Sequence, residues 1–251
     1  KHGLTTSDAT QIALRLANEP RRDDLQLINH LELVLTQQCN LRCDYCFVSD
    51  RPERMLTREL GEQAINFLLK TSGDLETVTI TFFGGEPLLA LNLLRQLVCY
   101  GEKAALKVAK KIQWRMTTNG TLLDGESLTF FKEHQVIYLL SLDGDKNTQD
   151  RHRKTISSKS SFEIIDNKLT LMKQYQPWIG ARVTLMPDTV DSLADNIRFL
   201  VRRGIQQFII EPAEGVEWPE VAWNTYEEQM VEVARYYYDH KETQNLRINF
   251  L

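Results

Sequence analysis

The chain has 251 residues and a formal net charge of -4 at pH 7, with 42% hydrophobic and 25% charged residues. These values are typical of a globular protein with a core of normal size. The negative charge argues against a protein that binds nucleic acid by neutralising phosphates, so no nucleic-acid partner is expected. No apolar run reaches the roughly 18 residues that a bilayer span requires, and the first residues show no signal-peptide pattern. We therefore expect a cytoplasmic protein without a membrane partner.

The predicted elements alternate between strands and helices along most of the chain. A short helix is expected over residues 6–18, and a charged linker follows it at 19–24. Apolar strand segments then occur at 31–36, 78–83, 112–117, 136–142, 181–186 and 207–210. Helical spacing occurs at 57–70, 88–110, 123–134, 161–175, 190–203 and 224–240. This alternation predicts an α/β fold of βαβ units around a parallel sheet.

Six such strands fit between residues 31 and 211. A complete eightfold barrel takes about 250 residues, so an open six-stranded barrel or a doubly wound sheet remains. Residues 247–251 resemble the beginning of another strand, and the chain starts at Lys1, so we expect a piece of a longer protein. The expected organisation is an N-terminal helix and linker over 1–30, a core over 31–215, and a C-terminal helix with the start of a further domain over 216–251.

Residues with unusual chemistry gather where the predicted strands end. A cysteine cluster follows the first strand, and polar or glycine-rich segments follow the other five. These segments begin at Gly84, Thr118, Ser141, Thr184 and Glu211. Loops of this kind are often rich in Gly, Asn and Asp. Six of them at the carboxyl ends of parallel strands, one with clustered cysteines, nevertheless indicate a shared site.

Cys39, Cys43 and Cys46 form a C-x3-C-x2-C run. Thiolates are the natural ligands of iron–sulfur clusters, and closely spaced cysteines can wrap one cluster from a single loop. Three thiolates on a four-iron cluster leave one iron open to a substrate or cofactor, by the same logic as an open catalytic zinc site. The alternatives are buried inert thiols and a structural zinc site, which needs four ligands and finds only Asp44 or His30 nearby.

Two tryptophans, Trp218 and Trp223, lie beyond the sixth predicted strand. They could line the substrate side of the site or cover the core. The sequence does not decide between these roles.

The cysteine run follows the first strand of a βα series and has Tyr45 before its third cysteine. In this context it resembles the signature of radical S-adenosylmethionine (radical SAM) enzymes. The other matches continue in chain order as Gly84-Gly85-Glu86-Pro87, Thr118-Asn119-Gly120-Thr121 and Ser141-Leu142-Asp143-Gly144. The resemblance covers residues 31–215 and implies a partial (β/α)6 TIM-like barrel with parallel strands. Within the superfamily the chain is most similar to the branch that matures peptides and proteins, which includes anaerobic sulfatase-maturating enzymes and SPASM-type ribosomal-peptide maturases.

The resemblance implies two cofactors, a 4Fe–4S cluster held by the three cysteines and S-adenosylmethionine bound at the fourth iron. Reductive cleavage of S-adenosylmethionine would give a 5'-deoxyadenosyl radical that abstracts hydrogen from the substrate. Gly84, Gly85 and Glu86 would meet the methionine amino group, because glycines allow the backbone to approach a ligand closely. Taken alone, the same residues would also suit a tight turn with a surface glutamate.

The resemblance assigns further cofactor contacts to Tyr45, Thr118, Asn119, Ser141, Asp143, Arg153, Thr184, Leu185 and Glu211. Arg153 would pair with the carboxylate of S-adenosylmethionine, or it would be a solvated surface residue. Asn119 would otherwise serve only to form an Asn-Gly turn. The ring of Tyr45 would otherwise serve only in packing.

These implications together predict a radical enzyme that modifies a peptide or protein by thioether formation, crosslinking or oxidation. An external flavodoxin- or ferredoxin-like protein would donate the electron. A radical enzyme acting on a small metabolite is the first alternative, and a zinc-stabilised interaction module without catalysis is the second. The branch commonly carries a cysteine-rich C-terminal domain with auxiliary clusters, whereas this chain has no cysteine after Cys99.

Overall fold

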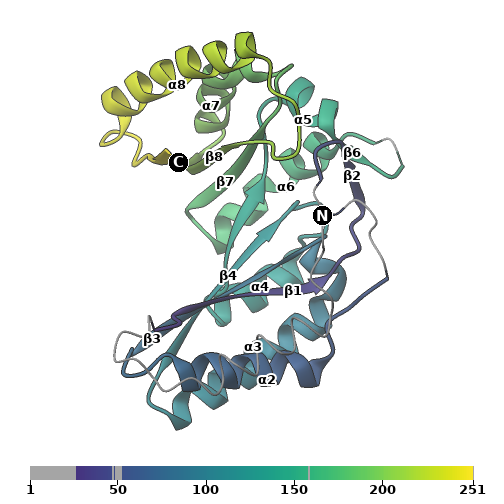
Figure 1. Ribbon diagram of the computed structural model, residues 1–251, viewed down its shortest axis with the longest axis vertical. Coiled ribbons are helices and arrows are strands. Elements are labelled where there is room, and N and C mark those ends of the chain that lie inside the picture. Colours follow the sequence, from purple (N-terminus) through teal and green to yellow (C-terminus); the bar gives the residue numbers. More distant parts are fainter. Residues whose placement is uncertain (1–26, 47, 49–52, 158, 251) are drawn as a thin grey trace, which may run out of the picture.

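The computed structural model describes residues 27–46, 48, 53–157 and 159–250. The helix expected over 6–18 lies outside these residues. Within the described chain, strands and helices alternate as the sequence predicts, and Figure 1 shows the strands as one curved, open sheet. Among the described helices, none has the length and apolar character needed to cross a membrane.

A parallel sheet of seven strands forms the centre of the described chain. The strands lie in the order β1-β3-β4-β5-β7-β8-β9, and all neighbours are parallel. Their bounds are His30–Thr36, Thr77–Gly84, Lys111–Thr118, Ile137–Ser141, Ile179–Leu185, Ile205–Pro212 and Arg247–Phe250. The spatial order follows the chain order, without the reversal that marks a doubly wound sheet. The partial-barrel fold class is thereby confirmed.

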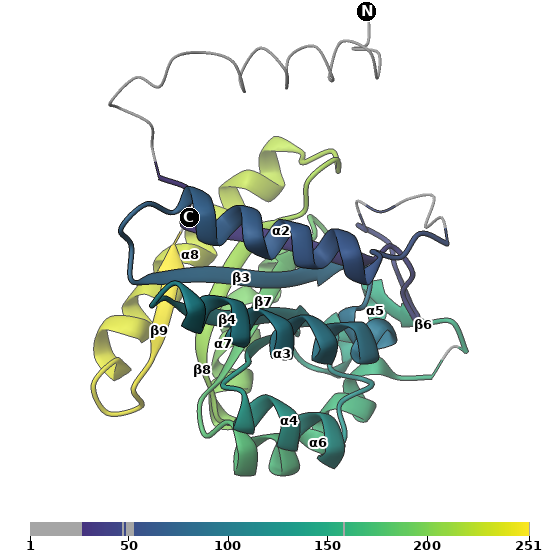
Figure 2. The same cartoon turned by 90° about the horizontal axis from the view of Figure 1, so that it is seen from below.

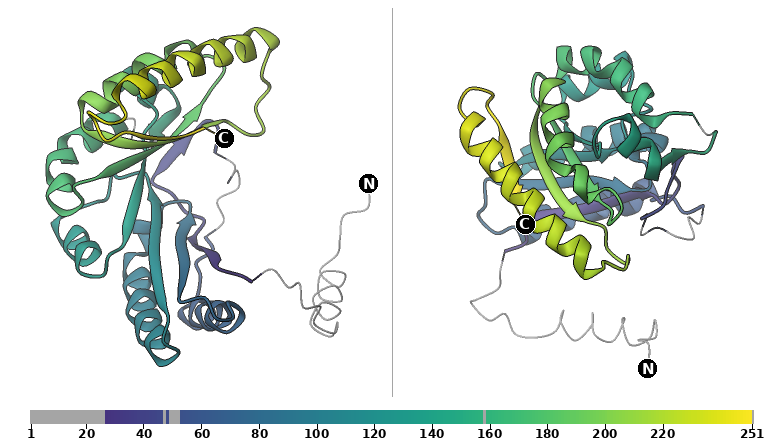
Figure 3. Two further views of the ribbon diagram at one scale, coloured as in Figure 1. Left: turned by 90° about the vertical axis from the view of Figure 1, so that its left-hand side faces the viewer. Right: turned by 90° about the horizontal axis from the view of Figure 1, so that it is seen from above.

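Helices follow the strands and lie on the outer side of the curved sheet, as Figures 2 and 3 show. They are α2 (Arg58–Thr71), α3 (Leu91–Lys107), α4 (Gly125–Glu133), α5 (Lys146–His152), α6 (Ser161–Tyr175), α7 (Leu193–Arg202) and α8 (Glu220–His240). Short 3-10 helices, η1 (Pro87–Ala90) and η2 (Val190–Ser192), precede α3 and α7. Side chains at Thr57, Asp124 and Ser160 accept hydrogen bonds from backbone N–H groups in the first turns of α2, α4 and α6, which explains why these helices begin there. The helix α8 leads to β9, which lies where the sequence predicts the beginning of a strand and joins the same sheet as its seventh strand.

The hydrophobic core lies between the sheet and these helices. Along β4, Ile112, Trp114 and Met116 are buried, whereas Gln113 and Arg115 between them are exposed. This alternation is expected for a strand with only one covered face, because successive side chains point to opposite sides.

Close packing of α3 on the sheet depends on a small residue at the contact. The rings of Phe82 and Trp114 stack in parallel, with centroids 5.5 Å apart. A Cβ atom on Gly101 of α3 would lie 2.6 Å from the Trp114 ring. Glycine therefore sets how closely the helix approaches the strand.

The inner face of the sheet is exposed in the part of the chain that the structure describes. Glu32, Thr81, Arg115 and Ile137 are neighbours in register across β1, β3, β4 and β5, so their side chains point to the same side. Ile137 is 47% exposed although it lies in a strand, and Arg115 is exposed in a central one. A complete barrel fills this space with its own side chains. The open sheet instead leaves charged and apolar side chains exposed on this face.

A second, two-stranded sheet was not predicted. In it, β2 (Leu41–Cys43) pairs antiparallel with β6 (Arg153–Thr155), which follows α5. Each strand has three residues, which is too short for a hydrophobic period to be detected. The pair ties the segment after β1 to the segment after β5.

Truncation of two leucines on α3 tests which side of this helix carries the core. Leu94 is fully buried, whereas Leu106 on the same helix is 78% exposed. We expect Leu94→Ala to lower the free energy of unfolding by about 2–5 kcal/mol, because it removes buried contacts and leaves a cavity. Leu106→Ala should change it by less than about 0.5 kcal/mol. Urea unfolding followed by circular dichroism measures both, and equal losses would contradict the packing described.

Candidate functional site

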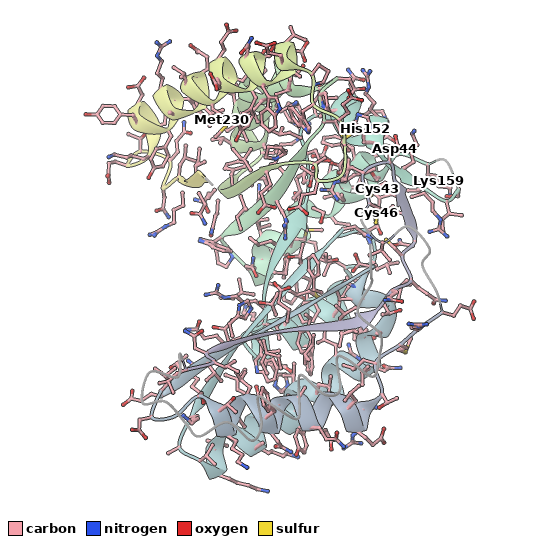
Figure 4. The ribbon with its side chains drawn as sticks, in the orientation of Figure 1. Cys43, Asp44, Cys46, His152, Lys159 and Met230 are labelled. Atoms are coloured by element: carbon pink, nitrogen blue, oxygen red, sulfur yellow. The ribbon has the colours of Figure 1, made fainter. Side chains whose placement is uncertain are left out.

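The cysteine loop, residues 37–46, lies at the carboxyl ends of the strands. Figure 4 shows Cys43, Asp44, Cys46 and His152 close together beside β2 and β6. In α/β folds with parallel strands this end of the sheet carries the site. The position predicted for the cysteines is therefore the one that they occupy.

Backbone contacts hold the second half of the cysteine loop. Cys43 lies opposite Arg153 in the β2–β6 pair. The Asp44 N–H donates to the carbonyl of His152 at 3.1 Å, and the Cys46 N–H donates to that of Cys43 at 3.2 Å. The last two cysteines thus sit on a turn that is fixed to the end of α5.

The Gly-Gly-Glu segment after β3 packs directly on the first half of the cysteine loop. The Gly85 N–H donates to the carbonyl of Thr36, and the Glu86 N–H to that of Gln38, both at 2.8 Å. A Cβ atom would lie 2.3 Å from the Thr36 oxygen if added to Gly84, and 2.1 Å from the Gln38 oxygen if added to Gly85. Gly84 also has a φ of +126°, which L side chains rarely adopt. The space beside Gly84 is filled by the end of β1, and the space beside Gly85 by the cysteine loop. Contact of the two glycines with the methionine amino group stays a prediction.

The Glu86 carboxylate is fully buried. Its Oε1 accepts hydrogen bonds from the Thr118 hydroxyl at 2.7 Å and the Leu88 N–H at 3.1 Å, and its Oε2 accepts one from the Asn119 N–H at 2.7 Å. Burial raises the pKa of Glu86 to about 7, although these hydrogen bonds favour the charged form. The carboxylate joins the loops after β3 and β4, so a surface position for it is excluded. Its contact with the methionine amino group stays a prediction.

The Asn119 side chain connects the loop after β4 to the first cysteine. Its Nδ2 donates to Asn40 Oδ1 at 2.8 Å and, over a longer distance of 3.8 Å, to Cys39 Sγ. Its Oδ1 accepts from the Thr121 N–H at 3.0 Å, which fixes the amide orientation. The Leu41 N–H donates to the same sulfur at 3.4 Å. Hydrogen bonds to cysteine sulfur are among the features that tune iron–sulfur clusters.

Asp143, at the end of β5, is the centre of a buried polar network. Its carboxylate accepts two hydrogen bonds from Arg153, at 2.8 and 2.9 Å, and one from the Thr184 N–H at 2.8 Å. The Tyr45 hydroxyl donates to the same carboxylate. Burial raises the pKa of Tyr45 well above its usual value, so the phenol remains a donor. Arg153 is buried, and its alternative assignment as a solvated surface residue is wrong.

The other predicted contact residues lie on β7 and β8. Thr184 and Arg182 are partly exposed, whereas Leu185 is buried in the core and its carbonyl accepts from the Ala213 N–H at 2.9 Å. Glu211 is in register with Thr184 and accepts a hydrogen bond from Arg182 at 2.5 Å. Any contact of Leu185 with a ligand would therefore involve its backbone.

Gln149 on α5 is a buried residue that the sequence did not single out as functional. Its Oε1 accepts from the Asp143 N–H at 2.8 Å, and its Nε2 donates to the carbonyl of Ser141 at 3.3 Å. The amide therefore fixes the turn at the end of β5 that contains the predicted contact residues Ser141 and Asp143. A glutamine on a short polar helix gives no sequence signal for this role.

His152 on α5 is a second buried residue that connects parts of the site. Its Nδ1 lies 3.2 Å from Asp44 and its Nε2 lies 2.9 Å from Asp188. The imidazole thus links the cysteine loop to the loop after β7. No metal-ligand spacing marks this histidine, so the sequence offered no reason to select it.

The three thiols of the loop fit an iron–sulfur cluster better than a single metal ion. Burial raises the pKa of Cys43 to about 11, and Cys39 and Cys46 also raise it, which places both of these thiols within electrostatic reach of Cys43. In the described residues, no three His, Cys, Asp or Glu side chains stand close enough together to hold one metal ion. In a four-iron cluster each thiolate binds a different iron, so its ligands are spaced more widely. Because the Cys43 thiol is protonated at neutral pH, loading a metal here must release protons.

Comparison with known proteins identifies the family. The radical SAM superfamily model matches residues 33–200, which is more than half of the chain. The chain therefore belongs to the radical SAM superfamily, whose enzymes use a 4Fe–4S cluster and S-adenosylmethionine. The enzyme class and the cofactors expected from the sequence are thereby confirmed.

The individual relatives include anaerobic sulfatase-maturating enzymes, the group that the sequence resembles. The chain is 29% identical over 147 residues to the cysteine-type anaerobic sulfatase-maturating enzyme of Clostridium novyi (strain NT), a match covering 56% of this chain and 39% of that protein. It is 27% identical over 186 residues to the radical SAM cyclopropyl synthase TigE of Paramaledivibacter caminithermalis, covering 68% of this chain and 38% of TigE. The chain thus spans about two fifths of the length of these relatives.

A solved structure shows the same fold. Native anSMEcpe with bound AdoMet and Cp18Cys peptide superposes with a TM-score of 0.75 at 20% sequence identity, covering 87% of this chain and 62% of that one. The partial barrel is confirmed by this likeness. The roles of individual site residues and the domain boundaries stay predictions.

Substitution of Gly85 tests whether the Gly-Gly-Glu segment holds the cysteine loop. In Gly85→Ala the new methyl group would meet backbone oxygens of Gln37 and Gln38, which cannot rotate away as side chains do. We expect the free energy of unfolding to fall by about 1–3 kcal/mol, and less iron to be bound after anaerobic reconstitution. The control is Gly125→Ala, since a Cβ atom there has nothing within 4 Å. Equal stability and equal iron content of the two variants would contradict the contact.

Glu86 makes the stability of the metal-free chain depend on pH. Its pKa is about 7 in the folded protein, against 4.5 for a glutamate in water, so between these values the folded chain binds more protons than the unfolded chain. The free energy of unfolding of the wild type, relative to Glu86→Gln, should therefore fall as pH rises from 4.5 to 7, by at most about 3 kcal/mol. Above about pH 8 the difference should be constant. Urea unfolding of both proteins across this range measures it, and parallel pH profiles would refute the buried carboxylate.

Proposed function

We propose that the complete protein is a radical SAM enzyme that abstracts a hydrogen atom from a peptide or protein substrate. The observation that carries this proposal is the position of the three-cysteine loop. It lies at the carboxyl ends of the strands, at the edge of an exposed inner sheet face. A radical formed there would be close to any molecule resting on that face.

The chain's own residues would hold and orient the cofactors. Cys39, Cys43 and Cys46 would bind three irons of the cluster, leaving the fourth for the amino and carboxylate groups of S-adenosylmethionine. When bound, these cofactors supply the 5'-deoxyadenosyl radical that removes the hydrogen atom. The segment at Gly85 and the Asp143 network fix the loop before any cofactor arrives, so the protein contributes position rather than chemistry.

The exposed inner face favours a peptide over a small metabolite. Small-molecule sites are usually concave and cover most of their ligand, whereas Val34 and Ile137 on this face remain nearly half exposed. Charged groups, such as Glu32 and Arg115, alternate there with apolar ones, as an extended peptide with mixed side chains would require. The related anSMEcpe structure holds AdoMet together with a peptide, which supports the same assignment here.

The modification is proposed to be a thioether, a crosslink or an oxidation, with a flavodoxin- or ferredoxin-like protein as the electron donor in the cytoplasm. Membership of the superfamily argues against a zinc-stabilised module without catalysis. Hydrogen abstraction is common to all three modifications, so the first test addresses that step.

Anaerobic reconstitution of the full-length protein tests the proposed chemistry. With dithionite and S-adenosylmethionine, the wild type should release 5'-deoxyadenosine. Cys43→Ala should lose this product and about four irons per chain, because one ligand of the cluster is missing. Cys99→Ala is the matched control, since this cysteine lies on α3 outside the loop, and it should keep both. Release of 5'-deoxyadenosine by Cys43→Ala at the wild-type rate would refute the assignment.

A further inference from the structure

The segment that follows β8 has an unusual charge distribution. Between residues 204 and 234 the chain has no lysine, arginine or histidine. The same segment has seven glutamates, namely Glu211, Glu214, Glu217, Glu220, Glu227, Glu228 and Glu232. Two of them are neutralised locally, because Glu211 pairs with Arg182 and Glu232 pairs with Arg198 and Arg235.

Three glutamates in the loop and at the start of α8 are exposed. Glu214, Glu217 and Glu220 form no ion pair with any residue that the structure describes. Like charges so close together repel, and this repulsion is relieved when a cation binds. The three glutamates therefore present a negative surface that no basic side chain of the described residues neutralises.

An aromatic cluster lies within the same segment. The ring centroids of Trp218 and Trp223 are 4.8 Å apart, and Tyr226 lies 6.3 and 5.8 Å from them in edge-on orientation. Trp223 is 42% exposed, and its neighbour Val221 is 71% exposed. These side chains form an apolar platform at the beginning of α8 that the described residues leave uncovered.

The platform is rigid because its inner side is anchored. Trp218 and Tyr226 pack against the hydrophobic core, and the Trp218 indole N–H donates to the carbonyl of Ala213 at 3.3 Å. One turn beyond Tyr226, the Gln229 side chain accepts a hydrogen bond from the Ala194 N–H at 2.9 Å, which ties α8 to α7. A surface fixed in this way loses little entropy when a partner binds.

The position of this surface connects it to the candidate site. It follows the carboxyl end of β8, the same end of the sheet that carries the cysteine loop. The Ala213 N–H still donates to the carbonyl of Leu185 on β7, so the segment begins at the rim of the inner face. In Figure 1 the connection from β8 to α8 lies on the same side of the molecule as β2 and β6. We call this surface, comprising Glu214, Glu217, Glu220, Val221 and Trp223, the acidic aromatic rim.

We propose that the acidic aromatic rim binds a basic segment of the peptide substrate while another part of the same peptide lies on the inner face. Lysine and arginine side chains form charge-assisted hydrogen bonds with carboxylates and stack on tryptophan faces. The carboxylates and the tryptophan of the rim therefore both favour lysine and arginine side chains. This inference rests on the proposed function, because it identifies the charge of the substrate for that site.

Binding of defined peptides to the full-length, cluster-loaded protein tests the proposal. The probes are two fluorescein-labelled peptides of equal length, one of repeated Gly-Lys-Ser and one of repeated Gly-Glu-Ser, and fluorescence anisotropy measures their affinities. The Lys peptide should bind more tightly, and its affinity should fall with added salt. The triple variant Glu214→Gln, Glu217→Gln, Glu220→Gln should weaken its binding about tenfold, since each exposed ion pair contributes modestly. Trp223→Ala should weaken it as well.

A matched control removes the same charge elsewhere. Glu59, Glu76 and Glu133 are exposed and lie outside the rim, so changing all three to glutamine should leave the affinity for the Lys peptide within about twofold. Equal weakening by both triple variants would overturn the proposal, as would equal affinity for the two peptides. Failure of the wild type to bind the Lys peptide, as expected if a segment outside the described residues covers the rim, would also overturn it.

The proposal for the rim and the proposal for radical chemistry can be tested separately. Peptide-independent release of 5'-deoxyadenosine should be unchanged in the rim triple variant, because these glutamates lie outside the residues assigned to the cofactors. Absence of this product in the wild type would refute the proposed function. Absence of selective Lys-peptide binding in a protein that forms the product would refute the rim alone.

Discussion

The candidate site depends on the buried carboxylate of Asp143. Hydrogen-bond donors from Tyr45, Arg153 and Thr184 converge on it, and these residues belong to the cysteine loop, the small β2–β6 sheet and β7. The guanidinium of Arg153 can be buried here only because this carboxylate neutralises it. Removing one partner of such a buried pair typically costs on the order of 3–5 kcal/mol. One side chain thus keeps three distant parts of the chain in contact.

A second group of contacts also holds the cysteine loop in place. Gly85 packs against Gln38 of the cysteine loop, the Glu86 carboxylate binds the loop after β4, and Asn119 of that loop donates to Cys39. Several residues that the resemblance assigns to cofactor contacts therefore use polar groups to hold one another. A site whose side chains are locked by their neighbours before binding is well suited to fix the geometry of a reaction.

The strands and helices of the βα units could be predicted from the sequence because each is long enough to show a hydrophobic period. The strands and helices predicted between residue 31 and residue 240 agree with the structure to within a few residues at their ends, whereas the short helix α5 was not predicted. The spacing of the three cysteines, directly after the first predicted strand, likewise predicted where the candidate site lies. The three-residue strands β2 and β6 carry no period, and the doubly wound alternative could be excluded only from the strand order.

Contacts within the site were less accessible to sequence reasoning. The sequence offered a ligand or solvent as the partner of Arg153, and it gave no sign of the buried pair that this residue forms with Asp143 across the end of the sheet. Gly84 and Gly85 have a packing role beside their predicted ligand contact, because backbone of Thr36 and Gln38 lies directly against them. His152 joins two aspartates on different loops. Each of these pairings depends on how separate loops meet in space, and no local spacing encodes it.

The hydrogen bonds to Cys39 have a consequence for electron transfer. The Asn119 amide is aimed at the sulfur and is itself held by Thr121 and Asn40, while the Leu41 N–H points to the same atom from the backbone. Dipoles that are already oriented need little rearrangement when the charge near them changes. If Cys39 holds a cluster, these two donors would contribute little to the reorganisation energy of its reduction, because they already point to the sulfur in the chain without it.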